Sequence, residues 1–216
     1  NDEIDRLRLC ATNSLFQRRD VIVVASVSCI YGIGSPQTYY SMSFTLQKNQ
    51  KISRKDILKS LVEIQYEREE TDFKRGTFRV RGDIIEVFPS YEDFAFRIEL
   101  DENRIKAISS IDPLLGKTLN SFDQILLYPR TFFSTPQDIL EYAIKSIEKE
   151  LEERVDFFKK QGKFIEANRI EERTLFDLEM LREFGYCPGI ENYSLYLSLR
   201  KPGEPPYTLL DYFPSD

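Results

Sequence analysis

Apolar residues recur every three or four positions in the first nineteen residues, and the pattern then changes to an apolar run. The first spacing predicts a helix over 1–19. One face of this helix collects Ile4, Leu7, Ala11 and Leu15. The run VIVVAS at 21–26 is typical of a strand buried on both sides of a parallel sheet. Helix, buried strand and the glycine-bearing loop that follows predict part of an α/β unit.

The middle of the chain begins with a short helix and continues in a hairpin. Ser53 in SRKD is a good N-cap with Asp56 at the third helical position, which predicts a helix through Ile64. In TFRVRGDIIEVFP, the pair Gly82-Asp83 suits a two-residue type II′ turn. The resulting register pairs Arg81 with Ile84, Val80 with Ile85 and Arg79 with Glu86.

The hairpin register separates apolar from charged side chains, because successive residues of a strand point to opposite faces. One face carries Phe78, Val80, Ile85 and Val87, and the other carries Arg79, Arg81, Ile84 and Glu86. The next strand, FAFRIEL, repeats the separation: Phe94, Phe96, Ile98 and Leu100 alternate with Arg97 and Glu99. We therefore predict a small antiparallel sheet with one apolar and one charged face, backed by the helix.

From position 130 onward the pattern is helical. Thr135-Pro136 suits an N-cap and first helical position, and apolar residues step by threes and fours from Leu140 to Phe158. After an interruption at Gly162, a second helix reaches Phe184 and ends at Gly185. The fold class is thus mixed, α/β and α+β: a piece of a parallel α/β lobe over 1–40, an inserted antiparallel-sheet domain over 41–129 and a helical subdomain over 130–216.

Composition excludes several classes of protein. The 216 residues are 41% hydrophobic and 31% charged, without an apolar run long enough to span a membrane, and the three cysteines have no metal-ligand spacing. We expect a cytoplasmic protein with free thiols. No histidine is present, which excludes histidine ligands and Ser-His-Asp triads, and a net charge of −6 argues against a broad DNA clamp. The chain starts at Asn1 with helical sequence, so we expect a segment of a longer protein.

The stretch IDPLLGKTLN contains Gly116-Lys117-Thr118, the closing half of a Walker A phosphate loop. The complete loop needs a glycine at position 111, where Ile111 stands, and Pro113 removes one of the N–H groups that would surround the phosphates. We interpret the stretch as a connection between strands. The sequence predicts no catalytic residues and no metal site.

Three groups of residues are candidates for binding, each with a structural alternative. The charged sheet face, with Arg68, Arg79, Arg81 and Arg97, is either a solvated surface or a protein-docking surface that grips carboxylates. Ser26 and Ser28 at the end of the predicted strand either contact phosphates or cap a turn. Aromatic residues interleaved with Glu191 and Asn192 in CPGIENYSLYL either contact bases or pack internally.

Four long segments resemble the UvrB family of bacterial nucleotide excision repair. They are RRDVIVVASVSCIYGIGSP, IQYEREETDFKRGTFRVRGDIIEVFP, LEMLREFGYCPGIENYS and PPYTLLDYFP, and the resemblance extends in order along essentially the whole chain. It implies a helicase-like ATPase that receives damaged DNA from UvrA, verifies the lesion and recruits the incising nuclease UvrC. In this family the ATP and Mg site uses motifs before and after the segment present here, so the resemblance implies no cofactor in this chain.

The resemblance also assigns roles to residues and domains. It implies UvrA contacts at Arg68, Arg79, Arg81, Arg97 and Glu99. It implies DNA contacts at Ser28, Arg173 and Glu191, with Ser26, Asn192 and Tyr193 as neighbours. Residues 1–40 would end the first motor lobe, 41–129 would be the UvrA-binding domain, and 130–216 would handle DNA. Two alternatives stay open: the UvrB-like module of a transcription–repair coupling factor, and a non-catalytic interaction scaffold.

Overall fold

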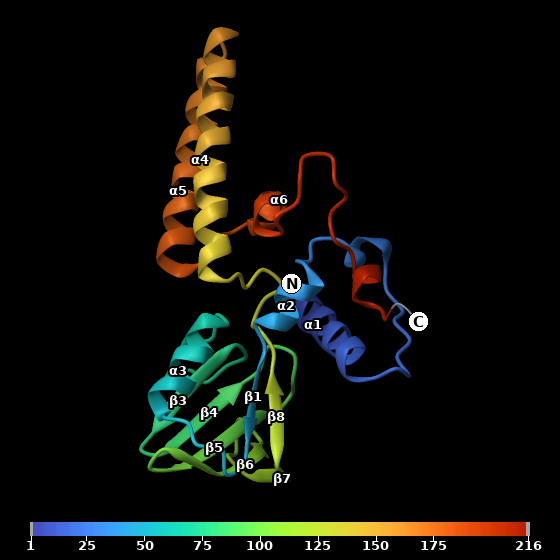
Figure 1. Cartoon of the computed structure of the whole chain (residues 1–216), viewed down its shortest axis with the longest axis vertical. Coiled ribbons are helices and arrows are strands. Elements are labelled where there is room, and N and C mark those ends of the chain that lie inside the picture. The colour runs from blue at the N-terminus through green and yellow to red at the C-terminus, as the bar shows by residue number, and fades with distance from the viewer. Residues whose placement is uncertain (1, 215–216) are drawn as a thin grey trace.

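The computed structural model describes residues 2–214, and Figure 1 shows them as three regions. A sheet region lies at one end, a long antiparallel pair of helices projects from the other, and the N-terminal helices lie beside the C-terminal tail between them. The predicted mixed fold class is confirmed, because the described residues contain helices together with a two-stranded and a six-stranded sheet. No helix among them combines the length and hydropathy that crossing a bilayer requires.

The N-terminal region contains α1 (Asp2–Gln17), the 3-10 helix η1 (Val27–Ile30) and α2 (Pro36–Ser41). The predicted first helix is confirmed, but only part of its predicted apolar face is buried. Leu9 and Leu15 are buried, whereas Ile4 and Leu7 are 47% and 53% exposed. Helical spacing therefore identified the helix without identifying which of its sides the rest of the chain covers.

The predicted buried strand at 21–26 is wrong for this chain. The segment is not part of either sheet. Its side chains alternate between two sides: Val21 and Val23 pack against the core, while Ile22 and Val24 are 91% and 94% exposed. A strand needs a neighbour to take its backbone hydrogen bonds. Among residues 2–214 no strand pairs with this segment.

The sheet region is larger than the three predicted strands. Its six-stranded sheet has the order β2-β3-β4-β5-β6-β7, with β2 parallel to β3 and all other neighbours antiparallel. The strands are β2 (Glu67–Arg68), β3 (Thr77–Arg81), β4 (Ile84–Phe88), β5 (Ala95–Asp101), β6 (Arg104–Ile111) and β7 (Thr118–Phe122). A separate ribbon pairs β1 (Phe44–Gln47) with β8 (Gln124–Leu127).

The hairpin and the helix behind it match the prediction. Arg81 pairs with Ile84 and Arg79 with Glu86, and Gly82 has a φ of 61°, as the first central residue of a type II′ turn requires. Helix α3 (Arg54–Glu63) is capped by Ser53, whose hydroxyl accepts a hydrogen bond from the Asp56 N–H. It buries Ile57 and Leu61 completely in a core with the apolar face of the sheet.

Gly116-Lys117-Thr118 connects two strands, as interpreted from the sequence. Thr118 begins β7, so a strand and not a helix follows the triplet. A phosphate loop needs a helix N-terminus at that position. The connection has no such geometry.

The projecting pair consists of α4 (Gln137–Lys160) and α5 (Phe164–Phe184), followed by η2 (Ile190–Tyr193), α6 (Ser194–Leu197) and η3 (Leu209–Tyr212). The two helices lie side by side and antiparallel, and the stop at Gly185, with a φ of 67°, is as predicted. The predicted cap at Thr135 is wrong: Pro136 occupies the N-cap, and the Thr135 hydroxyl donates to the Phe133 carbonyl instead. That local bond satisfies the hydroxyl outside the helix.

Stacked aromatic rings join the two ends of the chain. The rings of Tyr39 and Tyr128 stack with centroids 6.1 Å apart, and Phe16 and Tyr212 pack around them. The Tyr212 hydroxyl donates to the carbonyl of Gly34 over 3.0 Å. The C-terminal tail is thereby fixed to the N-terminal region.

Candidate functional site

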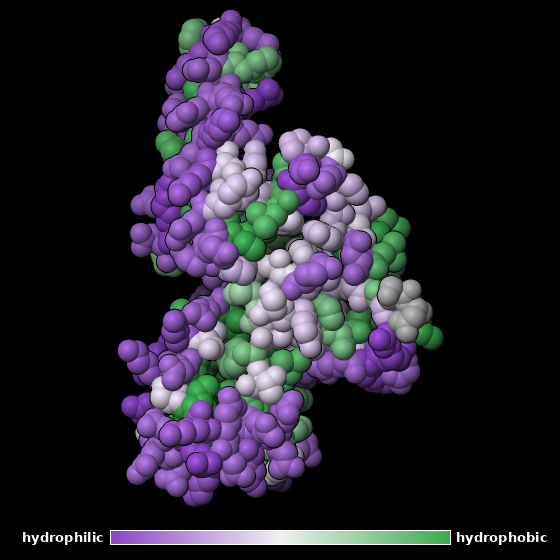
Figure 2. Space-filling view, viewed as in Figure 1, coloured by the Kyte–Doolittle hydropathy of each residue, from purple (hydrophilic) through white to green (hydrophobic). Residues whose placement is uncertain are grey.

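The charged face is the outward side of the central strands β3, β4 and β5. We define it by five side chains that strand alternation places opposite the core: Arg79, Arg81, Glu86, Arg97 and Glu99. Figure 2 shows a mostly hydrophilic surface over the sheet region and the helical pair, with more apolar surface where the regions meet. The charged face is thus part of a mostly hydrophilic surface.

A buried carboxylate organises the charged face. The Glu86 side chain is only 6% exposed and lies between two arginines. Its Oε2 accepts from Nε of Arg79 at 2.6 Å, and its Oε1 accepts from Nε of Arg97 at 2.8 Å, with Nη2 of Arg97 2.7 Å from the same oxygen. Burial disfavours the charged form of Glu86, but the hydrogen bonds from Arg79 and Arg97 outweigh burial and lower its pKa. One anion and two cations leave a net positive charge.

Further contacts hold the two arginines in place. The guanidinium of Arg79 lies 4.1 Å from the ring centroid of Phe73, a cation–π arrangement. Nη2 of Arg97 donates to the Gly116 carbonyl over 3.3 Å. Both side chains are oriented before any partner arrives, which lowers the entropy lost on binding.

The edge of the sheet carries a second, more exposed group. Nε of Arg68 donates to Oε1 of Glu70 over 2.8 Å, and Oε2 of Glu70 accepts from the Val80 N–H over 3.4 Å. The hydrogen bond from Arg68 is the main cause of a lowered Glu70 pKa, to which the nearby charge of Arg81 adds. Arg68 and Arg81 are therefore neighbours of the same carboxylate.

The five residues predicted to bind a partner thus fall into three places. Arg79 and Arg97 are joined through Glu86, Arg68 and Arg81 flank Glu70, and half-buried Glu99 lies opposite Ile84 on the adjacent strand. Strand alternation places Glu86 on this face but does not identify it as the centre. The predicted register, which sets Arg79 opposite Glu86, was the signal that could have identified it.

Four of the residues predicted to contact DNA converge near the base of α5. The Tyr193 hydroxyl donates to Oδ2 of Asp177 over 2.6 Å, and Nε of Arg173 lies 4.0 Å from the same oxygen. Gly189 has a φ of 76°, and a Cβ there would lie 2.9 Å from Nδ2 of Asn192. At the start of η2, the turn that contains Glu191, Gly189 therefore leaves room for the Asn192 side chain.

The cluster contains two carboxylates, Asp177 and Glu191, and one arginine, Arg173. The pKa of Tyr193 is raised, mainly by burial and next by the hydrogen bond to Asp177, so its phenol is neutral at pH 7. The pKa of the Cys187 thiol is raised to about 11, mainly by burial and next by the negative charges of Asp177 and Glu191. Exposed Arg173 is the cation of the group, so any phosphate contact would depend on this one side chain.

Ser26 and Ser28 make local contacts. Oγ of Ser26 lies 2.9 Å from Oγ of Ser28 and 3.3 Å from Sγ of Cys29, at the start of η1. Within residues 2–214 no hydrogen bond or ion pair joins them to the cluster around Asp177. The six predicted DNA contacts therefore form two groups.

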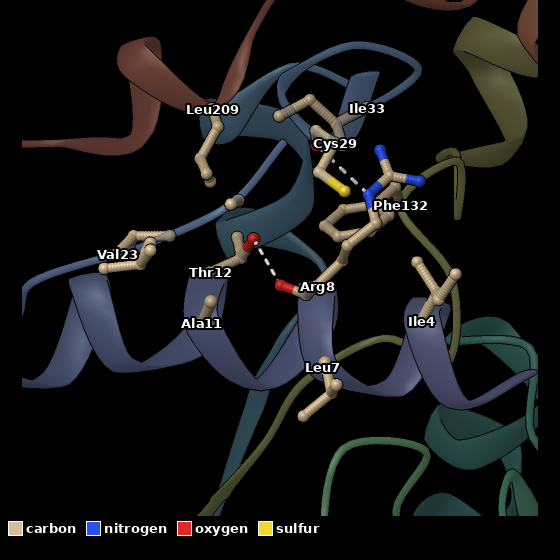
Figure 3. A pocket seen from close by; sticks show the side chains of 12 residues that line it. Ile4, Leu7, Arg8, Ala11, Thr12, Val23, Cys29, Ile33, Phe132 and Leu209 are labelled. Carbon is tan, nitrogen blue, oxygen red and sulfur yellow. Dashed lines mark hydrogen bonds between the residues drawn. The ribbon is translucent and has the colours of Figure 1, made fainter. Parts of the chain in front are cut away.

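Beside η1, a pocket of about 230 Å³ opens between α1 and residues 21–26 (Figure 3). Its lining is mainly apolar and includes Ile4, Leu7 and Val23. Arg8 is also part of the lining, but its Nε donates to the Cys29 carbonyl over 3.2 Å and its guanidinium lies over the Phe132 ring. This cation is engaged in holding η1 on α1. Among the described residues, no cluster of acidic and thiol side chains could hold a metal ion.

Comparisons with known proteins identify the same two regions. Residues 44–133 match the UvrB interaction domain, and residues 138–199 match the UvrB third helical domain. The charged face lies in the first match, and Arg173, Glu191, Asn192 and Tyr193 lie in the second. The boundaries predicted at 40/41 and 129/130 stay predictions.

Full-length similarity to curated proteins is high. The chain is similar to proteins called UvrABC system protein B from Carboxydothermus hydrogenoformans, Methanosphaera stadtmanae and Bacillus subtilis, with identities of 57%, 56% and 52%. All of this chain is covered in each comparison, but only 33% of each relative. The chain therefore spans about a third of the length of these relatives, and it belongs to the UvrB family.

Proposed function

We propose that this chain is the part of a UvrB protein that docks on UvrA in nucleotide excision repair, and that it helps to load and verify damaged DNA before incision. The observation that carries the proposal is the charged face, a pre-oriented arginine pair around buried Glu86, within the segment that matches the interaction domain. The relatives are described as components of a UvrABC system, which supports a partner from that system.

The chemistry of the charged face fits a protein partner. Arg79 uses its Nε for Glu86, and within residues 2–214 its terminal nitrogens make no hydrogen bond. A guanidinium held in this way binds a partner carboxylate with two parallel hydrogen bonds. Arg68 and Arg81 at the exposed edge add attraction that steers an acidic partner surface into place.

The remaining activities of the family extend the proposal to the intact protein. The cluster around Asp177 and the hydroxyls of Ser26 and Ser28 would contact DNA. ATP, Mg and the incising nuclease UvrC would be bound with parts of the protein beyond this segment. This chain would supply docking and DNA contacts but no catalytic residue.

The test is a calorimetric titration of this chain into purified UvrA, with Arg68→Glu/Arg81→Glu as the variant. Both side chains are exposed, so reversing their charge leaves the core intact. Arg79 is unsuitable for charge reversal, because a glutamate there would face buried Glu86. We expect affinity to fall at least tenfold, since both charges would repel an acidic partner.

The matched control is Arg169→Glu, an exposed charge reversal on α5 outside the sheet region. It should keep wild-type affinity. Equal affinity in the double variant and the wild type would contradict the docking proposal.

A further inference from the structure

The loop between β6 and β7 presents two adjacent leucines to solvent. Leu114 and Leu115 are 94% and 79% exposed, and they occupy the tip of the connection from Ile111 to Thr118. Single exposed apolar residues are ordinary on protein surfaces, but two neighbours this exposed at the end of a protruding loop are not needed for the fold.

Hydrogen bonds fix the backbone of this loop, although the side chains of Leu114 and Leu115 are exposed. Oδ1 of Asp112 accepts from the N–H groups of Leu114 and Leu115, each over 2.9 Å. The Gly116 N–H donates to the Asp112 carbonyl over 2.8 Å, and Gly116 adopts a φ of 67° that favours glycine. Pro113 fixes a further backbone angle. The backbone at both leucines is held in one conformation, so little backbone conformational entropy would be lost when they are buried in a partner.

The tip borders the charged face. The Gly116 carbonyl accepts from Nη2 of Arg97, the same nitrogen that contacts Glu86. One guanidinium therefore links the loop to the buried centre of the face. An apolar protrusion beside oriented charges is the arrangement found in protein interfaces, where an anchor side chain fills a pocket and polar groups surround it.

We propose that Leu114 and Leu115 are the apolar anchor of the docking surface and insert into a hydrophobic pocket of the partner that is rimmed by carboxylates. The inference rests on the proposed docking function and adds residues and a partner chemistry to it. Continuity with the charged face through Arg97 selects the partner of that face as the occupant.

The experiment is the titration into purified UvrA, with Leu114→Ser/Leu115→Ser in the whole chain. The loop hydrogen bonds come from Asp112 and the main chain, so this variant keeps the fold, and its thermal unfolding curve verifies this. Leu175→Ser is the matched control, because Leu175 is 51% exposed on α5, outside the sheet region. Leu114→Met/Leu115→Met should bind like the wild type, since methionine keeps an apolar side chain of similar size.

Anchor residues at interface centres dominate affinity, so we expect the double serine variant to bind at least tenfold more weakly, with the control unchanged. Unchanged affinity in the serine variant, together with loss of binding in Arg68→Glu/Arg81→Glu, would overturn the anchor and keep the docking function. If both double variants bind as the wild type does, both proposals fail.

Self-association of the chain is the competing explanation of the exposed tip, and analytical ultracentrifugation measures it without UvrA. A dimer that dissociates in the serine variant, with UvrA affinity unchanged, would assign the leucines to a second copy of this chain and overturn the proposal. A monomer at every concentration, together with weaker UvrA binding, supports it.

Discussion

Glu86 in the sheet and Asp177 in α5 are both buried carboxylates, with side-chain exposures of 6% and 7%, but their neighbours differ. Glu86 contacts two guanidinium groups at 2.6 Å and 2.7 Å. Asp177 accepts a hydrogen bond from a neutral phenol at 2.6 Å, and its cation, Arg173, is 4.0 Å away. A buried charge is stable only when it is paired or well hydrogen-bonded. One carboxylate is therefore stabilised by charge, and the other mainly by a hydroxyl.

The largest effect should come from Glu86→Ala, which leaves two neighbouring guanidinium groups without their anion. We expect a loss of about 3 kcal/mol in the free energy of unfolding, at the lower end for a broken buried ion pair because both arginines are partly exposed. Urea denaturation followed by circular dichroism measures it. Glu99→Ala on the same face is the control, with an expected change within about 0.5 kcal/mol. Equal changes in both variants would show that the arginines do not depend on Glu86.

A smaller effect should follow from Tyr193→Phe, which removes only the hydroxyl that Asp177 uses. We expect destabilisation by about 1–2 kcal/mol, because a buried carboxylate loses a hydrogen bond and keeps only the more distant Arg173. Hydrogen exchange of amides in α5 and η2 would detect the local loss. Tyr186→Phe, a nearby and more exposed tyrosine, should leave exchange unchanged. Wild-type protection in Tyr193→Phe would mean that Arg173 alone satisfies the carboxylate.

The smallest effect concerns pH. The folded-state pKa of Glu86 is lowered, so its contribution to stability is complete above the unfolded value of about 4.3 and is lost as pH falls through the folded value. Glu86→Gln lacks this contribution. The difference in stability between wild type and variant should therefore shrink on acidification below about pH 4.3. A difference independent of pH would show that Glu86 does not ionise differently in the two states.

The charged face could be predicted from sequence because local chemistry fixes it. Gly82-Asp83 sets the turn, the turn sets the register, and strand alternation then places every side chain of β3 and β4. The strands β6 and β7 were missed. Their register shifts at Ser110/Ile111, and the strand TLNSF has a largely exposed side-chain pattern without clear alternation.

Other failures have a different cause. The apolar run at 21–26 predicts burial, but a sequence pattern does not say which segment provides the cover, and here Ile22 and Val24 remain exposed. The hydrogen bond between Tyr193 and Asp177 joins two elements across a turn whose geometry depends on Gly189. Such a contact needs the path of the chain, which propensity and periodicity do not determine.

The ribbon of β1 and β8 has a consequence for how the chain tolerates rearrangement. Phe44 pairs with Leu127, so the chain enters and leaves the sheet region at neighbouring points. The sheet region separates Tyr39 from Tyr128 in the sequence, but the paired strands bring the chain back to its starting point. The stacking of these two rings therefore does not cost the entropy of closing a long flexible segment. The region between β1 and β8 thus begins and ends at one place, so that its two connections to the rest of the chain lie side by side.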